Sequence, residues 1–488
     1  MATAPILVPG DNCWRIERAD RAAVIVDAED YFRAAKASML QARKRIMLIG
    51  WDFDTRIELE PRKRTLPGPN QVGRFLRWLT RERPELEIYL LKWDLGTLSD
   101  GLPRGMPPVF LLNWITGKRL HLQADSVHPP GAAHHQKIVV IDDAIAFCGG
   151  IDMTVDRWDS RSHTDGDVRR TEPNGEKYNP WHDATIAVDG AAARAMGDLA
   201  RARWQAASGE ELEPVADEDR ESVDWPDAIT PTIRDVDVAI TRTLPELEDR
   251  TEVREVEALF LATIAAAKRT LYIENQYLGS RTIAEAIAAR LRQQDGPEVV
   301  LVIARNATGW LEQKTMDGAR ARLLRLLWKA DEHDRLAVYY PVTAAGEPIY
   351  VHAKVLTVDD RMLRVGSANL NNRSMGFDTE CDLAIEATGP DAQRIADTVL
   401  DFRDDLIAEH FDTTVAAVRK AIDAADGSVQ YAVESLVREP GSGRTLVPFE
   451  RETIEGEDSP LAENELMDPE TAAIPPPDLL RRLWNRFT

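Results

Sequence analysis

Apolar stretches of strand length alternate along the chain with amphipathic stretches of helix length. In the first part of the chain, helical apolar spacing occurs over residues 34–42 and 72–82. Continuous apolar runs typical of buried strands occur at 45–51 (RIMLIGW) and 86–92 (LEIYLLK). The segment 137–150 (KIVVIDDAIAFCGG) predicts two short strands around an Asp-Asp turn.

The same scheme returns further along the chain. Residues 253–268 and 283–293 have the helical pattern, and residues 270–278 (TLYIENQYL) and 299–304 (VVLVIA) have the strand pattern. Alternation of strands and helices favours an α/β fold in which helices cover the sheets.

Between these two regions the pattern disappears. Residues 208–232 are acidic and aperiodic, which indicates a surface linker, and we place the domain boundary near 225. The sequence therefore predicts half-domains at 1–225 and 226–438. Residues 439–488 are rich in Gly, Pro and Glu and are expected to be a disordered tail. The tail ends in a short amphipathic helix, which docks on the body or lies on a membrane surface.

Composition narrows the classes of partner. The 488 residues carry a net charge of −22, which repels nucleic acid and anionic membranes and suits a zwitterionic lipid better. The three cysteines form neither a metal cluster nor a disulfide framework, as in a reducing compartment. No signal peptide or membrane-spanning run is evident. We expect a cytoplasmic or peripheral membrane protein, with export without a cleaved signal left open.

The strongest chemical signal is a repeated motif. The segments 135–152 (HQKIVVIDDAIAFCGGID) and 352–369 (HAKVLTVDDRMLRVGSAN) share His, Lys, Asp and Gly at identical offsets. The matched pairs are His135 and His352, Lys137 and Lys354, Asp142 and Asp359, and Gly149 and Gly366. A duplicated domain with pseudo-twofold symmetry would bring both copies to one cleft.

The spacing within each copy suits a phosphate. In a strand, His and Lys at i and i+2 project from the same face, so an imidazole lies beside an ammonium group. Two such pairs provide two cations for phosphoryl oxygens and two imidazoles for attack and protonation. Gly149 and Gly150 allow close backbone approach, and Ser367 and Asn369 are hydrogen-bond donors for the phosphate.

The paired motifs resemble those of the phospholipase D superfamily. Its eukaryotic-type phospholipases D are similar to this chain over residues 30–435, most closely at 273–278 (IENQYL), 366–386 and 149–159. The resemblance implies a duplicated fold of two α/β/α sandwich halves with mixed sheets that share one active-site cleft. The lipid-binding modules that precede the catalytic core in the eukaryotic enzymes have no counterpart before His135.

The resemblance also implies a two-step reaction through a phosphohistidine, with no metal or other cofactor. Because the two motif copies are nearly symmetric, the sequence hardly distinguishes which histidine attacks and which protonates. We assign His135 as nucleophile and His352 as general acid, with Lys137 and Lys354 contacting the phosphoryl oxygens. Each imidazole needs a carboxylate partner to fix its tautomer.

For these partners the sequence offers one carboxylate in each half. In the second half Glu380 matches the acidic residue of the family, with Asp382 as a same-face alternative, and in the first half the candidate is Asp183. The remaining motif aspartates, Asp142, Asp359 and Asp152, are expected to be structural.

The expected activity is that of a phospholipase D acting on phosphatidylcholine or phosphatidylethanolamine, with transphosphatidylation left open. We expect a monomer that meets phospholipid at a membrane surface and does not bind nucleic acid. A phosphatidyltransferase like cardiolipin synthase is the alternative. A nuclease or DNA phosphodiesterase fits the negative net charge less well. A lipid-binding module without activity fits the two intact motifs less well.

Overall fold

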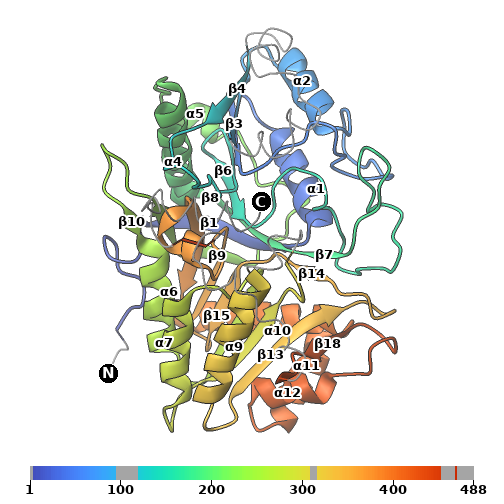
Figure 1. The fold of residues 1–488 in the computed structure, drawn as a ribbon. Helices are drawn as coiled ribbons and strands as arrows, with labels where there is room; N and C mark the ends of the chain where they lie inside the picture. Colours follow the sequence, from blue (N-terminus) through green and yellow to red (C-terminus); the bar gives the residue numbers. More distant parts are fainter. Residues whose placement is uncertain (1–3, 95–118, 308–315, 452–467, 470–488) are drawn as a thin grey trace, which may run out of the picture.

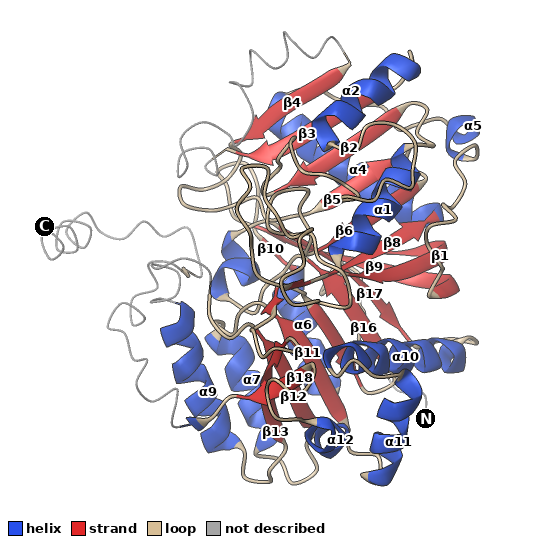
Figure 2. Ribbon diagram, turned by 90° about the vertical axis from the view of Figure 1, so that its right-hand side faces the viewer, coloured by secondary structure: helices blue, strands red, loops and turns tan. Residues whose placement is uncertain are grey.

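The structure, a computed structural model, describes residues 4–94, 119–307, 316–451 and 468–469. They form one mixed sheet of 16 strands that runs through the whole molecule, with helices on both faces (Figures 1 and 2). Within these ranges, no helix is both long enough and apolar enough to cross a bilayer.

The first half contributes one edge of the sheet. Its elements are β1 (Arg15–Val26), α1 (Ala28–Met39), β2 (Arg45–Gly50), α2 (Val72–Glu82), β3 (Glu87–Trp93), β4 (Leu120–Asp125), β5 (Ile138–Ile141), β6 (Ile145–Gly149), β7 (Trp181–His182), β8 (Ala184–Asp189), α4 (Gly190–Ser208) and α5 (Asp217–Arg220).

The second half contributes the other edge. Its elements are β9 (Ile233–Leu244), β10 (Val253–Arg254), α6 (Glu255–Ala266), β11 (Thr270–Asn275), α7 (Arg281–Leu291), β12 (Glu298–Ile303), α9 (Gly318–Ala330), β13 (Leu336–Val342), β14 (Tyr350–Val351), β15 (Val355–Val358), β16 (Met362–Gly366), the π-helix η3 (Arg373–Phe377), β17 (Glu380–Glu386), α10 (Ala392–His410), α11 (Val415–Ala424), α12 (Val429–Leu436) and β18 (Thr445–Pro448).

The strand order is nearly a palindrome about the β1–β9 pair. From that pair outward, the first half runs β8, β6, β5, β2, β3, β4, and the second runs β17, β16, β15, β11, β12, β13 before β18. The long strands β1 and β9 are antiparallel, with Ala19 opposite Val236. This pairing joins the two halves into a single sheet and relates them by pseudo-twofold symmetry.

The cores follow the same symmetry. On one face, α4 and α10 occupy equivalent places after β8 and β17, and one apolar core that includes residues of both helices extends across both halves. On the other face, α1 and α2 cover the first half and α6, α7 and α9 cover the second, each over a separate core. The junction of the halves is therefore built on a continuous buried layer.

The structure confirms the α/β class and most of the predicted elements, among them α2 at the predicted bounds. The structure adds that the sheets of the two halves are continuous and form a single sheet. A difference from the prediction lies in the expected surface linker, where Trp225 and Ile229 are buried against the core of the first half. The indole N–H of Trp225 donates to the carbonyl of Ile229, so this part of the linker is packed.

Part of the expected disordered tail is also ordered. Residues 445–448 form β18, which pairs with β13 and extends the sheet, and the carboxylate of Asp468 accepts hydrogen bonds from the backbone of Asn372 and Arg373. Apolar Leu446 is buried in the sheet, which favours order here. The expected terminal amphipathic helix lies outside the described residues.

Candidate active site

Both His-x-Lys segments lie where one half of the molecule meets the other. The backbone N–H of His135 donates to the carbonyl of Thr379, 3.0 Å away in the second half. In the same manner, the N–H of His352 donates to the carbonyl of His182, 2.8 Å away in the first half. Next to this contact, β7 and β14 form a two-stranded parallel sheet between the halves. Each motif is thus held in place by the other half.

The imidazole of His135 contacts a carboxylate across the junction. Its Nδ1 lies 3.0 Å from both oxygens of Glu380, which is fully buried. The hydroxyls of Ser367 and Ser374 donate to the two oxygens of the same carboxylate. Burial raises the pKa of Glu380 well above its usual range. Burial, Lys137 and Lys354 lower the pKa of His135 well below its usual range.

The imidazole of His352 is paired in the same way with Asp183. The Nδ1 of His352 lies 2.6 Å from Oδ2 of Asp183, whose other oxygen accepts from the backbone N–H of Ala184. Burial raises the pKa of Asp183 to about 7. Burial, Lys354 and Arg157 lower the pKa of His352 well below its usual range. Both carboxylates named by the sequence contact a histidine, but each contacts the histidine of the opposite half.

The two lysines differ in their surroundings. The Nζ of Lys137 lies 2.9 Å from Oδ2 of Asp152. Lys354, the equivalent residue, instead donates to the amide oxygen of Gln276 at 3.1 Å, and no described carboxylate lies within ion-pair distance of it. Burial lowers the pKa of Lys354 to about 7. The cationic site is therefore asymmetric, and only one of its two ammonium groups is neutralised by a neighbouring carboxylate.

The serine expected at the phosphate has another contact. Ser367 is fully buried and its hydroxyl donates to Glu380, so it supports the carboxylate partner of His135, and its contact with a phosphate stays a prediction. Asn369 has a buried amide oxygen without a hydrogen-bond partner in the described part of the chain. Its NH2 group, the donor of the amide, stays a predicted contact of the phosphate.

The glycines that follow the first motif leave room for the carboxylate partner. A Cβ at position 150 would overlap the carboxylate of Asp183, and one at position 149 would meet Thr185. In the second motif the equivalent position holds Ser367. The serine of one copy and the glycine of the other therefore serve the same purpose, because each helps to place a carboxylate beside a histidine.

The last aspartates of the two motifs bind backbone rather than the histidines. Asp142 accepts from the N–H groups of residues 43–45 at 2.6–2.9 Å, and Asp359 accepts from those of residues 268–270 at 2.8–3.1 Å. Both aspartates have positive φ, in the turns that the sequence predicted. They fix the starts of β2 and β11. Asp382, the alternative partner, pairs instead with Arg364.

Several further residues lie at this junction, and among them Arg157, Gln276 and Tyr350 were not singled out from the sequence. Trp181 lies with its ring centroid 5.0 Å from that of His352 and 4.6 Å from that of Tyr350, and the guanidinium of Arg157 lies 4.4 Å from the Trp181 ring. The amide oxygen of Gln276 accepts a hydrogen bond from Nζ of Lys354. Arg157 and Gln276 stand inside the segments 149–159 and 273–278 that carried the family resemblance, so that resemblance was the available signal.

Comparison with known proteins agrees with this geometry. The family model "Phospholipase D" matches residues 125–293, and the model "Cardiolipin synthase, PLD-like domain" matches residues 260–401. Phospholipase D A of Dictyostelium discoideum is 24% identical over 444 residues, which cover 76% of this chain and 33% of that protein. Phospholipase D alpha 4 of Arabidopsis thaliana is 22% identical, with coverage of 73% and 60%.

A solved structure shares the fold. Phosphatidylserine synthase of Haemophilus influenzae Rd KW20 aligns with a TM-score of 0.56 at 13% identity, over 82% of this chain and 89% of that one. The chain spans between about a third and three fifths of the length of the first curated relatives it matches. With two matching family models, one on each motif-bearing region, the chain belongs to the phospholipase D superfamily.

Proposed function

We propose that this chain is a phosphodiesterase that hydrolyses glycerophospholipids, phosphatidylcholine or phosphatidylethanolamine, to phosphatidic acid and the free head group. The observation that carries the proposal is the crossed pairing of His135 with Glu380 and of His352 with Asp183, beside two buried lysines. Relatives named phospholipase D support the substrate class.

The phosphodiester binds between the two lysines. Lys137 and Lys354 are at most 4% exposed, and a charge-assisted hydrogen bond is stronger in such a site than in water. The amide of Asn369 adds a neutral hydrogen bond. Because the two ammonium groups lower the pKa of both imidazoles in the free protein, the negative charge of a bound phosphodiester reverses part of that effect.

In the first step His135 attacks phosphorus. Its Nδ1–H donates to Glu380, which leaves a lone pair on Nε2 for the new P–N bond. The bond from phosphorus to the head-group oxygen breaks, and that oxygen takes a proton from His352. The side chain of His135 is 14% exposed and that of His352 6%, which favours His135 as the residue that reaches phosphorus.

In the second step water attacks the phosphohistidine on the side the head group has left. His352, now neutral, takes a proton from the water, the P–N bond breaks, and phosphatidic acid is released. Asp183 holds the His352 ring through both steps, because its carboxylate accepts from Nδ1. An alcohol in place of water gives transphosphatidylation by the same route.

The setting is a membrane surface. A net charge of −22 disfavours binding to nucleic acid and to strongly anionic membranes, so a zwitterionic lipid in a weakly charged bilayer fits best. The chain acts there as a peripheral, monomeric protein.

The second candidate is a phosphatidyltransferase. One observation favours it: the family model that matches residues 260–401 is described as "Cardiolipin synthase, PLD-like domain". The proposed chemistry is the same up to the phosphohistidine, and only the acceptor differs.

The test is head-group release by the purified protein. Vesicles of phosphatidylcholine or phosphatidylethanolamine are incubated with and without an added alcohol, and products are identified by mass spectrometry. Choline or ethanolamine release with phosphatidic acid in water alone supports the hydrolase, and product only with the alcohol supports the transferase. Release should be lost in His135→Ala and His352→Ala and kept in His333→Ala, an exposed control. Cleavage of single-stranded DNA with no lipid turnover would overturn the proposal.

A further inference from the structure

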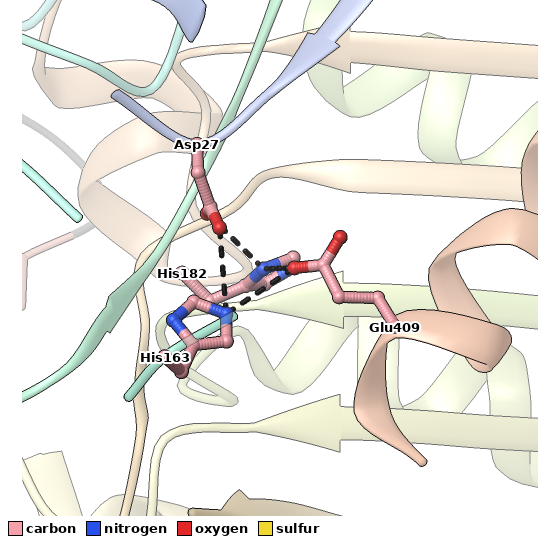
Figure 3. Close-up of side chains that lie close together, drawn as sticks. All are labelled: Asp27, His163, His182 and Glu409. Atoms are coloured by element: carbon pink, nitrogen blue, oxygen red, sulfur yellow. Dashed lines mark hydrogen bonds and ion pairs between the residues drawn. The ribbon is translucent and has the colours of Figure 1, made fainter. Parts of the chain in front are cut away.

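A second group of chemically active side chains lies beside the catalytic junction. It consists of Asp27 after β1, His163 in the loop before β7, His182 in β7 and Glu409 in the last turn of α10 (Figure 3). All four side chains are ionisable, yet each is at most 5% exposed. Three of them come from the first half of the chain and Glu409 comes from the second. Figure 3 shows both imidazoles between the two carboxylates.

The four side chains converge on one point. Oε1 of Glu409 lies 3.2 Å from Nε2 of His163 and 3.0 Å from Nδ1 of His182. Oδ2 of Asp27 lies 3.4 Å from the same nitrogen of His163, and Oδ1 of Asp27 lies 3.4 Å from that of His182. Four ligands placed tetrahedrally at about 2.0–2.1 Å from a zinc ion are separated by about 3.3 Å. The four distances from the imidazole nitrogens to the carboxylate oxygens, 3.0–3.4 Å, are close to that separation.

The outer nitrogens of both imidazoles carry a different kind of contact. Nδ1 of His163 lies 3.0 Å from Asp159, and Nε2 of His182 lies 2.7 Å from Glu274. A metal-bound imidazole commonly donates its remaining N–H to a carboxylate in this way. The outer carboxylates are themselves held, Asp159 by Arg170 at 3.0 Å and Glu274 by the hydroxyl of a buried tyrosine.

Neutral imidazoles do not satisfy the hydrogen bonding at the centre of the cluster. A neutral imidazole has a single N–H, yet each of these rings meets carboxylates at both nitrogens. Each ring needs either a second proton or a metal ion on its inner side. Charge-assisted N–H···O contacts are typically about 2.7–2.9 Å, shorter than the 3.0–3.4 Å found on the inner side. In addition, Oδ2 of Asp27 is buried without a hydrogen-bond partner among the described residues.

The charges of the cluster call for additional positive charge. Asp27, Asp159, Glu274 and Glu409 bring four negative charges, and among the described residues they contact the guanidinium groups of Arg170 and Arg161 and the imidazole of His410. Buried charges are costly unless they are paired or bind a metal, and the two charges left over are balanced by a proton on each inner imidazole or by one divalent cation. The long inner distances favour the cation.

We infer that Asp27, His163, His182 and Glu409 form a buried site for one divalent transition-metal ion, with zinc as the metal that best fits two imidazoles and two carboxylates in a tetrahedral arrangement. The ion has a structural role and takes no part in the phosphoryl transfer. It joins α10 of the second half to three segments of the first.

The place of this site in the fold explains what the ion would stabilise. The backbone N–H of Asp27 donates to the carbonyl of Asp183 at 2.8 Å, and the N–H of Asp183 donates to a carboxylate oxygen of Asp27 at 3.1 Å. His182 is the residue before Asp183. The ion therefore fixes the backbone from which Asp183 reaches His352.

The test is the metal content of the full-length protein, purified without immobilised-metal chromatography and then dialysed separately against zinc, cobalt or manganese. We expect about one tightly held ion per chain by elemental analysis, and visible absorption typical of tetrahedral Co²⁺ for the cobalt form. The X-ray absorption spectrum should show four N/O ligands, two of them imidazoles. A strong chelator should lower the Tm of the wild type. These measurements need no variant and are independent of lipid turnover.

Two variants locate the ion. His163→Asn and Glu409→Gln should lose the ion and the chelator effect on Tm, whereas His333→Asn, on the surface, should keep both. Where a variant does not fold, the imidazole count from the X-ray absorption spectrum of the wild type decides. The inference is overturned by a wild-type protein that holds less than about 0.1 ion per chain of each metal and is unaffected by chelator, or by folded variants that keep the ion.

Discussion

Nδ1 of His135 lies 3.0 Å from both carboxylate oxygens of Glu380, although the two residues come from opposite halves of the chain. The contact between His352 and Asp183 crosses the same junction in the opposite direction. Neither half therefore contains a complete pair of imidazole and carboxylate. This reciprocal exchange explains why the halves share one continuous sheet and one continuous core, since a small shift between them would separate both pairs.

Replacing Glu380 by Gln should leave the fold intact and slow the reaction. The amide keeps the size of the carboxylate but does not stabilise the imidazolium-like charge that develops on His135, and its NH2 group competes for the ring nitrogen. We expect kcat to fall by roughly 10²–10⁴ with a small change in KM, as for other His–carboxylate pairs. Steady-state kinetics on phosphatidylcholine vesicles measure the effect. The exposed Glu285→Gln is the control, and an equal loss in both variants would contradict the role of Glu380.

The order of the histidines can be read from a trapped intermediate. In His352→Ala, a phospholipid analogue with a nitrophenol leaving group needs no general acid, so His135 still attacks. Water then lacks its base, and we expect a burst of about one equivalent of nitrophenol followed by slow turnover. Peptide mass spectrometry should find the phosphoryl group on His135.

The reciprocal variant is the control for this experiment. His135→Ala should give neither a burst of nitrophenol nor a peptide that carries the phosphoryl group, because the proposed nucleophile is missing. A burst in His135→Ala, with the phosphoryl group on His352, would make His352 the nucleophile and leave the rest of the mechanism unchanged.

The pH dependence should reveal the unpaired lysine. Burial lowers the pKa of Lys354 to about 7, so its ammonium is charged below pH 7 and becomes neutral above it. Because kcat/KM reports the free enzyme, we expect it to fall about tenfold per pH unit above that value. In Gln276→Glu a carboxylate replaces the amide oxygen 3.1 Å from Nζ, and the alkaline limb should move up by about one unit or more.

A surface substitution of the same kind separates this effect from a general change in charge. Gln293→Glu, on an exposed turn beside Arg290, should leave the pH profile unchanged. If the alkaline limb of Gln276→Glu stays where it is in the wild type, a group other than Lys354 controls it.

Much of the site could be predicted because its key residues lie close together in the sequence, within each motif. His135, Lys137, His352 and Lys354 follow from one spacing found twice, and the Asp-Asp turns follow from the same repeat. The carboxylate partners were harder to pair, because the sequence places Asp183 and Glu380 in their own halves and only the β1–β9 junction reveals the exchange. Strands β1 and β9 themselves mix polar and apolar residues and were not predicted.

The four residues of the inferred metal site lay beyond the reach of sequence reasoning. They stand at positions 27, 163, 182 and 409, with no short spacing that a search for metal ligands would detect. The expectation that the reaction needs no metal came from the family resemblance, and no short spacing of ligands suggested a separate metal site. Only packing of α10 against β7 and the end of β1 brings Glu409 to the other three, and packing between distant segments is the information that periodicity lacks.

The glycine at position 150 provides a test of how closely Asp183 must be held. A Cβ there would overlap the Asp183 carboxylate, so in Gly150→Ala the carboxylate must move away from His352. Overpacking in a buried site typically costs about 1–3 kcal/mol, and we expect a lower Tm together with a large fall in kcat per folded molecule. The matched control is Gly197→Ala in α4, where a Cβ would overlap the carboxylate of Asp143, a partner of Arg201 and not of a histidine. It should lower Tm in a similar way and leave kcat nearly unchanged. Equal losses of kcat in both variants would mean that stability, and not the contact of Asp183 with His352, limits the activity.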